Sequence, residues 1–515
     1  MMMSQQSRTS LAAKNIFWGY VGNVSTMLIS FATRTVFIYT IGITYLGING
    51  LFTNVLGVLS FTELGIGTAM NFSLYKPVAD NDREKIKALM QLYRNAYRVV
   101  ALVVAVLGLV LLPFLPYIIK GANEIDNLQL YYLLFLFNTV SSYFVTYKYG
   151  LINAEQRGYI LTNINSAFHI AILLAQIAVL LMYKNFLGYL LTQSAVQLIQ
   201  KIITAFYIDK RYPFLKDKNI KKLDSEETKK IKKNVNALIV HKIGDISVHQ
   251  TDNIIISALI NVTVVGLVSN YNLLVVTIST FLNIIFNSFT AGFGNLIATE
   301  SKEKQLEMFT VYHFLGFWVF GFTTISFIVL IQPFITLWIG PDKLIDNFSM
   351  LLIMANHYLM GQRITVNNFK IAGGVFNEDK FISILQSVVN LIVSVTLVRF
   401  IGLPGIYIGT VLQGLISNLL RPAIVYRVLF ASSAVGYYKD FVKYFVVTTL
   451  TAILMLYISN NVLKTVNLKS FVVMVALTAV IPNMVFAALF WRNKSFKIIL
   501  QRIKSLAKGR ARNAG

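Results

Sequence analysis

The stretch Asn15–Ile41, NIFWGYVGNVSTMLISFATRTVFIYTI, decides the fold class, because Arg34 is its only charged residue. A helix that crosses the hydrocarbon core of a membrane needs about 20 mostly apolar residues, and this stretch is longer. Arg8 and Lys14 precede it, but the apolar run is too long for a cleaved signal peptide, and no small-residue cleavage site follows a short apolar core. The stretch therefore predicts a first membrane span that is retained.

The composition extends this prediction to the whole chain. Of 515 residues, 56% are hydrophobic and 13% are charged, whereas ordinary soluble domains carry about 25% charge. The mean hydropathy is +0.63. Because the hydrophobic excess runs along the entire length, it excludes a soluble globular protein and an enzyme on a single anchor, and it predicts an all-α polytopic membrane protein. The lack of cysteine excludes a disulfide framework, a thiolate metal site and a cysteine nucleophile.

Turns and charged residues divide the chain into fourteen apolar segments, so we predict about 14 transmembrane helices. The expected spans are 15–41, 46–72, 91–119, 128–150, 160–183, 186–208, 237–259, 263–291, 309–331, 348–371, 381–399, 403–427, 440–461 and 468–491.

The distribution of Lys and Arg supports an even number of spans. Cytoplasmic loops carry an excess of these residues, and with a cytoplasmic N-terminus most of the 46 fall in predicted inner loops or at their edges. The predicted outer loops hold only Lys120, Lys184, Lys343, Arg399, Lys464 and Lys469. Both termini are therefore expected on the cytoplasmic side, and the net charge of +24 reflects topology rather than a nucleic-acid partner.

A weak internal repeat divides the chain into two halves. Thr33–Ile38 aligns with Thr251–Ile256 at a shift of 218, and nearly the same shift matches Gly47 with Gly266. This predicts two pseudo-symmetric six-helix lobes that are parallel repeats, as in transporters that work by alternating access with the substrate path between the lobes. The expected parts are an N-lobe at 1–208, a basic cytoplasmic linker at 209–236, a C-lobe at 237–430, two further helices at 431–491 and a basic cytoplasmic tail at 492–515.

The first span carries the clearest candidate for binding an anion. Arg34 shares a helical face with Ser30 and Asn23, at offsets of four and eleven residues. Charged residues inside a span usually face protein or a watery cavity, and a guanidinium can hold phosphate oxygens in bidentate fashion. The alternative is that Arg34 extends to the outer headgroups.

The seventh predicted span carries one polar stripe. His241, Asp245, His249 and Asp252 follow one another at spacings of four, four and three. An imidazole beside a carboxylate can titrate near neutral pH, so His241, Asp245 and His249 are candidates for ion coupling, and Asp252 for the cavity wall. Alternatively, His241 and Asp245 lie at the cytoplasmic headgroup level without a specific role. No third histidine or carboxylate cluster supports a metal site.

Two isolated ionisable residues lie at membrane depth, Glu63 in the second span and Arg363 in the tenth. Each is a candidate substrate contact or half of an ion pair between helices. The chain lacks the phosphate-binding motif GxxxxGK[ST], so ATP is not expected as the energy source. No cofactor is expected, and active transport would use a H⁺ or Na⁺ gradient or the gradient of the substrate.

Several stretches resemble a known family. They are Tyr45–Asn54 (YLGINGLFTN), Glu63–Ala69 (ELGIGTA), Leu74–Ala79 (LYKPVA), Lys85–Met90 (KIKALM), His241–Asp245 (HKIGD) and Thr251–Ser257 (TDNIIIS). These stretches resemble the bacterial polysaccharide repeat-unit flippases, the Wzx-like transporters of the multidrug, oligosaccharidyl-lipid and polysaccharide exporter (MOP) superfamily.

The resemblance implies a flippase, not an enzyme. It implies that undecaprenyl-diphosphate-linked oligosaccharide is moved from the cytoplasmic to the outer leaflet of the bacterial inner membrane for surface polysaccharide assembly. Membrane lipids and polymerase or other assembly proteins would be partners, and the last two helices would help form a groove for the lipid tail. Cavity candidates carried over by position are Arg34, Asp252, Glu63 and Arg363. The family can carry several cavity arginines, whereas Arg34 is the only clear mid-span cation predicted in the first half.

Two alternatives remain open. A cation-coupled multidrug antiporter of the same superfamily would need buried carboxylates to attract its substrate. The first predicted span of this chain carries an arginine instead. A membrane-embedded glycosyltransferase or polymerase would need a positioned carboxylate or base, usually in a sizeable outer loop, and the predicted outer loops are short.

Overall fold

The computed structural model describes residues 8–60, 63–217, 250–375 and 378–513, together with scattered positions between 220 and 235. Within these residues the regular structure is helical, and no strand occurs. The chain divides into two compact units, Met1–Gly266 and Leu267–Gly515. The lobe and linker boundaries expected from the sequence stay predictions.

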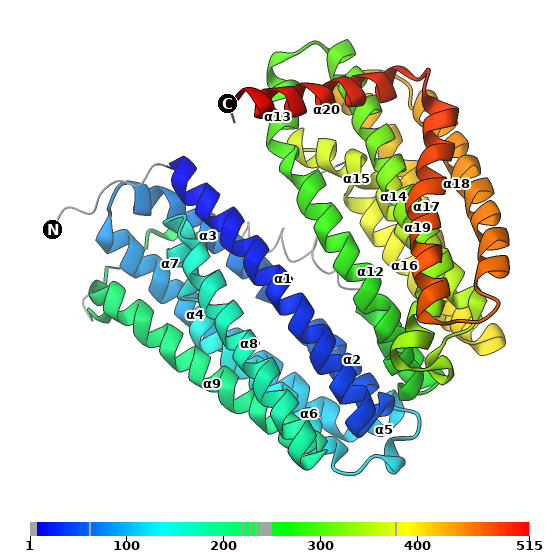
Figure 1. Cartoon of the computed structure of the whole chain (residues 1–515). Helices are drawn as coiled ribbons and strands as arrows, with labels where there is room; N and C mark the ends of the chain where they lie inside the picture. Colours follow the sequence, from blue (N-terminus) through cyan, green and yellow to red (C-terminus); the bar gives the residue numbers. More distant parts are fainter. Residues whose placement is uncertain are drawn as a thin grey trace. The chain divides into compact units, whose positions relative to one another are not determined.

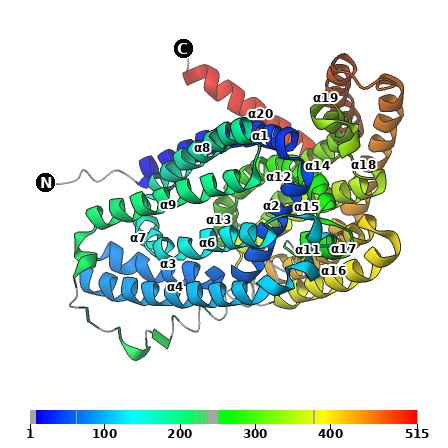
Figure 2. The same cartoon turned by 90° about the horizontal axis from the view of Figure 1, so that it is seen from below.

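The first unit is a bundle of helices, several of which are interrupted (Figures 1 and 2). Its elements are α1 (Arg8–Ile41), α2 (Ile43–Leu59), α3 (Glu63–Ala79), α4 (Arg83–Leu111), η2 (Leu112–Phe114), α5 (Leu115–Ile118), η3 (Ala122–Glu124), α6 (Leu128–Thr146), α7 (Tyr149–Ala154), α8 (Gly158–Tyr183), α9 (Phe186–Arg211), η4 (Pro213–Lys216) and α11 (Thr251–Leu259).

Packing in the first unit follows the chain closely. Helix α1 packs along α8, and α8 along α9, while α6 contacts both α4 and α9. Gly42, at φ 89°, separates α1 from α2 in a backbone conformation that favours glycine. Asp82 caps α4 by accepting a hydrogen bond from the Lys85 amide at 3.0 Å. These contacts place α1, α8 and α9 side by side.

The glycines matched by the internal repeat meet in space. Added Cβ atoms at Gly47 of α2 and Gly266 of α12 (Val262–Ser288) would overlap the backbone oxygens of Val262 and Ile43, respectively. One turn away, the hydroxyls of Thr44 and Thr263 lie 3.0 Å apart, within hydrogen-bonding distance. Small residues let membrane helices approach this closely. The repeat therefore has a direct structural consequence, because corresponding positions of the two halves form one helix crossing.

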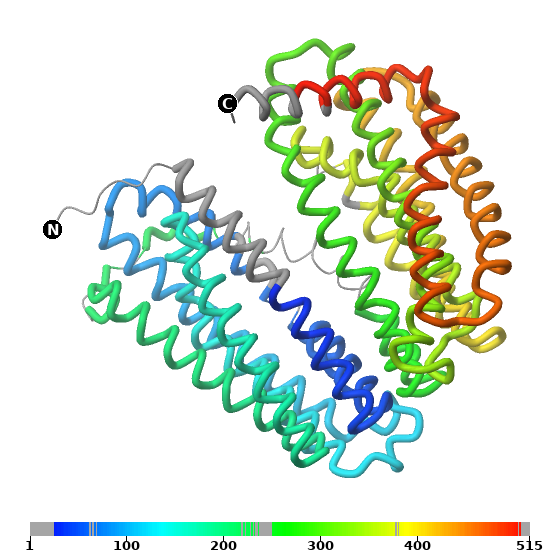
Figure 3. Tube along the Cα trace, in the orientation of Figure 1, coloured from blue at the N-terminus to red at the C-terminus, as the bar shows by residue number. Residues whose placement is uncertain are grey.

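The second unit contains the rest of α12 and the helices that follow it, traced in Figure 3. These elements are α13 (Thr290–Thr299), α14 (Lys302–Ile339), η5 (Pro341–Lys343), α15 (Asn347–Ala372), α16 (Lys380–Ile401), α17 (Leu403–Val425), a π-helical turn η6 (Tyr426–Phe430), α18 (Val435–Val462), α19 (Leu468–Phe490) and α20 (Lys494–Asn513). Helix α15 packs against both α14 and α17, and α16 packs along α17.

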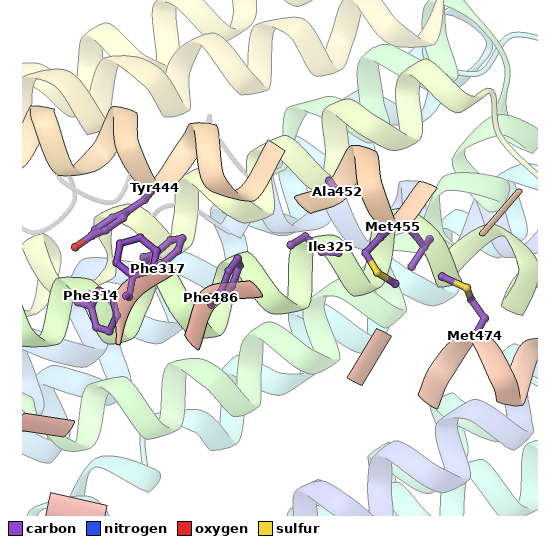
Figure 4. Close-up of a cluster of buried hydrophobic side chains, with 10 residues drawn as sticks. Phe314, Phe317, Ile325, Tyr444, Ala452, Met455, Met474 and Phe486 are labelled. Atoms are coloured by element: carbon purple, nitrogen blue, oxygen red, sulfur yellow. The ribbon is translucent and has the colours of Figure 1, made fainter. Parts of the chain in front are cut away.

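An aromatic core attaches the two extra C-terminal helices to the second unit (Figure 4). Phe317 of α14 stacks on Tyr444 of α18 at a centroid distance of 4.2 Å, and Phe486 of α19 lies 5.0 Å from Phe317. Each of these three side chains is at most 1% exposed. Burial of large aromatic side chains stabilises such contacts, so α18 and α19 are fixed to α14.

The predicted fold class is confirmed. Nine helices or joined helix pairs among the described residues are long and apolar enough to cross a membrane. Helices α1, α9, α15 and the broken pair α2–α3 account for four more predicted spans, and α11 is the described part of the span expected at 237–259. The fold therefore has about 14 transmembrane helices. The segment expected as a basic tail contains a further helix, α20, which contacts α14.

Candidate functional site

Polar side chains recur at helical spacing on three adjacent helices of the first unit. Thr26, Ser30 and Arg34 follow one another at four-residue intervals on α1, so they share one face. Helices α8 and α9 carry similar strips, and α8 packs against both α1 and α9. We call the combined surface the polar face; its members are Thr26, Ser30 and Arg34 of α1, Asn165, His169 and Gln176 of α8, and Tyr189, Gln193, Gln197 and Gln200 of α9.

A hollow of about 290 Å³ lies within the polar face. Thr26, Asn165, His169 and Gln197 line it, and Gln200 donates a hydrogen bond to Asn165 Oδ1 at 2.7 Å. Its volume is near the lower end of the range for small-molecule sites, about 300–1,000 Å³. Amides, a hydroxyl and an imidazole can both donate and accept hydrogen bonds, so the hollow suits a neutral polyhydroxyl group.

The guanidinium of Arg34 belongs to a second part of the same face. Arg34 is partly exposed and interacts electrostatically with Tyr189 of α9. Gln176 Nε2 donates to the backbone oxygen of Tyr189 at 3.5 Å and to Gln193 Oε1 at 3.3 Å. Phe37, one turn after Arg34, packs edge-on against Tyr189 at 4.9 Å. The cation therefore interacts with Tyr189, whose backbone oxygen accepts a hydrogen bond from Gln176, and Ser30 lies one turn before it on α1.

A second cation in the same bundle was missed by the sequence analysis. Lys201 lies within α9, and its Nζ donates to the Asn138 backbone oxygen and to Ser141 Oγ, both at 2.8 Å. Asn138 Nδ2 in turn donates to Ser194 Oγ at 3.0 Å. The expectation that Arg34 is the only clear mid-span cation of the first half is therefore wrong. A polar patch on α6 satisfies the ammonium inside the helix bundle.

Glu63 and Asp252 lie outside the polar face. Glu63, in the first turn of α3, interacts with Tyr143 of α6, whose hydroxyl donates to Ser60 Oγ at 2.8 Å. Asp252 lies in the first turn of α11, which packs on α2. These two candidates therefore belong to different helix contacts of the first unit.

Arg363 lies in α15 of the second unit and is only 9% exposed. Its Nη1 has no hydrogen-bond partner, and among the described residues no acidic side chain forms an ion pair with it. The ion pairs near it in sequence use other residues, since Asp379 pairs with Arg421 at 2.8 Å and with Lys370. The part of the chain that the structure describes thus provides no carboxylate for the ion-pair alternative at Arg363.

The remaining predicted site residues cannot be placed. His241, Asp245 and His249 lie outside the described residues, and so does the side chain of Asn23, although its backbone belongs to α1. Among the described side chains, no cluster of three or more metal-ligating residues occurs.

The fold matches solved transporters. Lipid II flippase MurJ, in an inward closed conformation, aligns with a TM-score of 0.66 and 13% identity, covering 92% of this chain and 99% of that chain. An inward-facing MATE family transporter of the MOP superfamily aligns with a TM-score of 0.57 and 13% identity, covering 79% and 98%. The chain is therefore a polytopic membrane protein with the fold of this transporter superfamily.

The family follows from the sequence itself. The family model described as polysaccharide biosynthesis protein matches residues 12–290, more than half of the chain. The chain belongs to this family, and the resemblance found in its sequence is confirmed. No curated protein matches the chain significantly.

Proposed function

We propose that this protein flips undecaprenyl-diphosphate-linked oligosaccharide repeat units from the cytoplasmic to the outer leaflet of the bacterial inner membrane by alternating access. The observation that carries the proposal is the polar face, in which an arginine and an amide-lined hollow occur together at membrane depth. Support also comes from the polysaccharide biosynthesis family and from a fold shared with a lipid II flippase.

The chemistry of the polar face suits such a headgroup. Sugar hydroxyls that leave water need replacement hydrogen bonds, because unsatisfied polar groups inside a membrane cost several kcal/mol each. Asn165, Gln197 and Thr26 can supply them from three helices. Arg34 can hold phosphate oxygens through paired N–H groups. The proposed division of roles is therefore sugar in the hollow and diphosphate at Arg34, with Asp252 and Glu63 as candidate contacts elsewhere along the path.

The driving force is a further part of the proposal. A H⁺ or Na⁺ gradient would bias the transporter through His241, Asp245 and His249. To move the two-state equilibrium from 1:99 to 99:1, substrate and ion together must bind one state about 5.5 kcal/mol more tightly than the other. His169, which lines the hollow, is an additional titratable group on the polar face.

A multidrug antiporter is the second candidate, and the polar face disfavours it. An amphipathic cation would be attracted by a buried carboxylate, yet no member of the polar face is acidic and Arg34 is positive. Drug efflux by the purified protein would favour this alternative.

Complementation of surface polysaccharide export tests the proposal in cells. We expect Arg34→Ala to abolish export, and Arg34→Lys to retain part of it, because the charge remains while the bidentate geometry is lost. Tyr39→Ala is a matched control, since Tyr39 is 66% exposed on the same helix. Membrane levels of each variant are measured in parallel. Wild-type export by Arg34→Ala would contradict the role of the polar face.

A further inference from the structure

A second, larger cavity lies at the end of the first unit where α8 begins and α9 ends. It has a volume of about 1,100 Å³ and is lined by the end of α3, the start of α4, α7, the end of α9 and η4. This end of the unit is the one that the Lys and Arg distribution predicts to be cytoplasmic. Because three arginines line it, Arg83, Arg157 and Arg211, we call it the arginine pocket.

The charge of the arginine pocket is only partly neutralised. Glu155 is the only acidic residue among its lining residues. Its Oε2 lies 3.5 Å from Arg157 Nε and 3.4 Å from Arg211 Nη2, so two guanidinium groups share one carboxylate. Arg83 adds a third positive charge and is exposed. The lining therefore carries a formal excess of positive charge that favours an anion.

Aromatic rings orient two of the arginines. The guanidinium of Arg83 lies 5.7 Å from the ring centre of Phe214, and that of Arg211 lies 5.6 Å from that of Tyr212. Tyr212 and Phe214 pack edge to face at 6.1 Å. Stacking on a ring restricts the planar guanidinium while leaving its N–H groups able to bind an anion.

Ion pairs hold the wall of the pocket that follows α9. Lys87 Nζ of α4 lies 2.9 Å from Asp217 Oδ2, just after η4. Lys148 Nζ lies 2.6 Å from Asp209 Oδ1 near the end of α9. Lys87 is only 5% exposed, whereas the Asp217 side chain is 49% exposed. The segment that carries Tyr212 and Phe214 is thereby fixed to the helix bundle at both ends.

The position of the pocket indicates a ligand from the membrane interface. Tyr75, which lines the pocket, is 50% exposed, and Phe72 on the same helix is 71% exposed. Exposed aromatic side chains near helix ends are typical of the headgroup region of a membrane. We therefore expect the opening at the headgroup level, where phosphate groups of lipids are found.

We infer that the arginine pocket binds the phosphate group of a membrane-anchored phosphate ester. Arginines match phosphate oxygens in bidentate geometry, and the volume accommodates a headgroup larger than phosphate itself. The same chemistry is offered by an anionic phospholipid headgroup and by the diphosphate of a polyprenyl lipid. The inference does not depend on the proposed flipping activity, because the pocket is formed by residues outside the polar face.

Native mass spectrometry of the full-length protein in detergent tests this inference. The probes are phosphatidylglycerol, undecaprenyl diphosphate and soluble inorganic pyrophosphate. The variant is Arg83→Gln/Arg157→Gln, which leaves the Arg211 contact with Glu155 in place. Arg98→Gln is the matched control, because Arg98 is exposed on α4 and does not line the pocket. Thermal unfolding of all three proteins establishes that they are folded.

We expect wild type and Arg98→Gln to retain phosphatidylglycerol or undecaprenyl diphosphate, and the double variant to lose at least tenfold in retention of the same lipid. The lipid affected identifies the source of the phosphate. Equal retention by the folded double variant, or binding of pyrophosphate without either lipid, would overturn the inference. Because the readout is binding, it is independent of whether the protein flips lipid.

Discussion

Helix pairs α8–α9 and α16–α17 occupy corresponding places in the two repeats, yet the amides of α8 and α9 line a hollow in addition to bonding across the pair. Between α16 and α17 the amides bond to the partner helix, since Gln386 Nε2 donates to the Gln413 backbone oxygen at 2.9 Å and Asn390 Nδ2 donates to Thr410 Oγ1 at 3.3 Å. Between α8 and α9, Gln176 and Gln200 also donate hydrogen bonds across the pair, but Asn165, Gln197 and Gln200 line a hollow as well.

Glycine explains the difference. An added Cβ at Gly409 of α17 would overlap Ser394 of α16, so the two backbones approach closely enough for their side chains to pair. The corresponding pair in the first unit contains Gly188, where an added Cβ would lie 3.1 Å from the end of the Val179 side chain. The same residue types therefore stabilise one repeat and can bind substrate in the other.

The largest expected effect is loss of the close α16–α17 contact. Gly409→Leu should destabilise the protein by about 3 kcal/mol or more, because overpacking at a backbone contact cannot be relieved by a side-chain rotation. Gly188→Leu should cost less, since Val179 can move. Thermal unfolding of detergent-purified variants measures both, and equal losses would remove the proposed difference between the helix pairs.

Amide replacements separate binding from stability. Gln197→Leu on the polar face should lower lipid flipping at least tenfold with a small effect on unfolding. Gln386→Leu should cost about 1–2 kcal/mol of stability, because the buried acceptors on Gln413 lose their donor. If Gln386→Leu impaired flipping more than Gln197→Leu at equal membrane levels, the assignment of roles to the two repeats would be reversed.

The two membrane-depth arginines provide a third contrast. Arg363 is buried without an acidic partner among the described residues, so Arg363→Met should leave stability unchanged or raise it by about 1 kcal/mol. We expect flipping to remain within about twofold of wild type. Loss of a charged contact to substrate would instead cost roughly 1.5–3 kcal/mol, which is an effect of about tenfold or more. Loss of flipping by a stable Arg363→Met protein would place this residue in the substrate path.

The smallest effect is expected where the two repeats cross. Thr44→Val removes the 3.0 Å hydroxyl contact with Thr263 but preserves the shape of the side chain. Hydrogen bonds between membrane helices contribute about 0.6 kcal/mol on average. A double-mutant cycle with Thr263→Val measures the coupling, and a value near zero would show that this hydroxyl contact does not stabilise the crossing.

Much of the fold could be predicted from the sequence, because a long apolar run predicts a membrane helix. The two glycines matched in the sequence, Gly47 and Gly266, also meet in the structure, since close backbone contact requires small residues at both positions. The common face of Ser30 and Arg34 followed from helical spacing within α1. These features depend on one segment at a time or on a direct internal repeat.

The rest of the candidate site depends on which helices become neighbours. Asn165, His169 and Gln197 are ordinary polar residues in their own spans, and they form a hollow only when α8 packs between α1 and α9. Lys201 was hidden for the same reason, because its partners lie on α6. Four-residue spacing of amides inside consecutive apolar runs is the signal that could have identified the polar face.

The most direct test measures leaflet exposure of a lipid-linked oligosaccharide in proteoliposomes, with and without a H⁺ or Na⁺ gradient. Wild type, Arg34→Ala and Tyr39→Ala are compared at equal reconstituted amounts. We predict protein-dependent exposure of the sugar by wild type and Tyr39→Ala, and its loss in Arg34→Ala. Undiminished exposure by Arg34→Ala, or none by folded wild type under either gradient, would contradict the account.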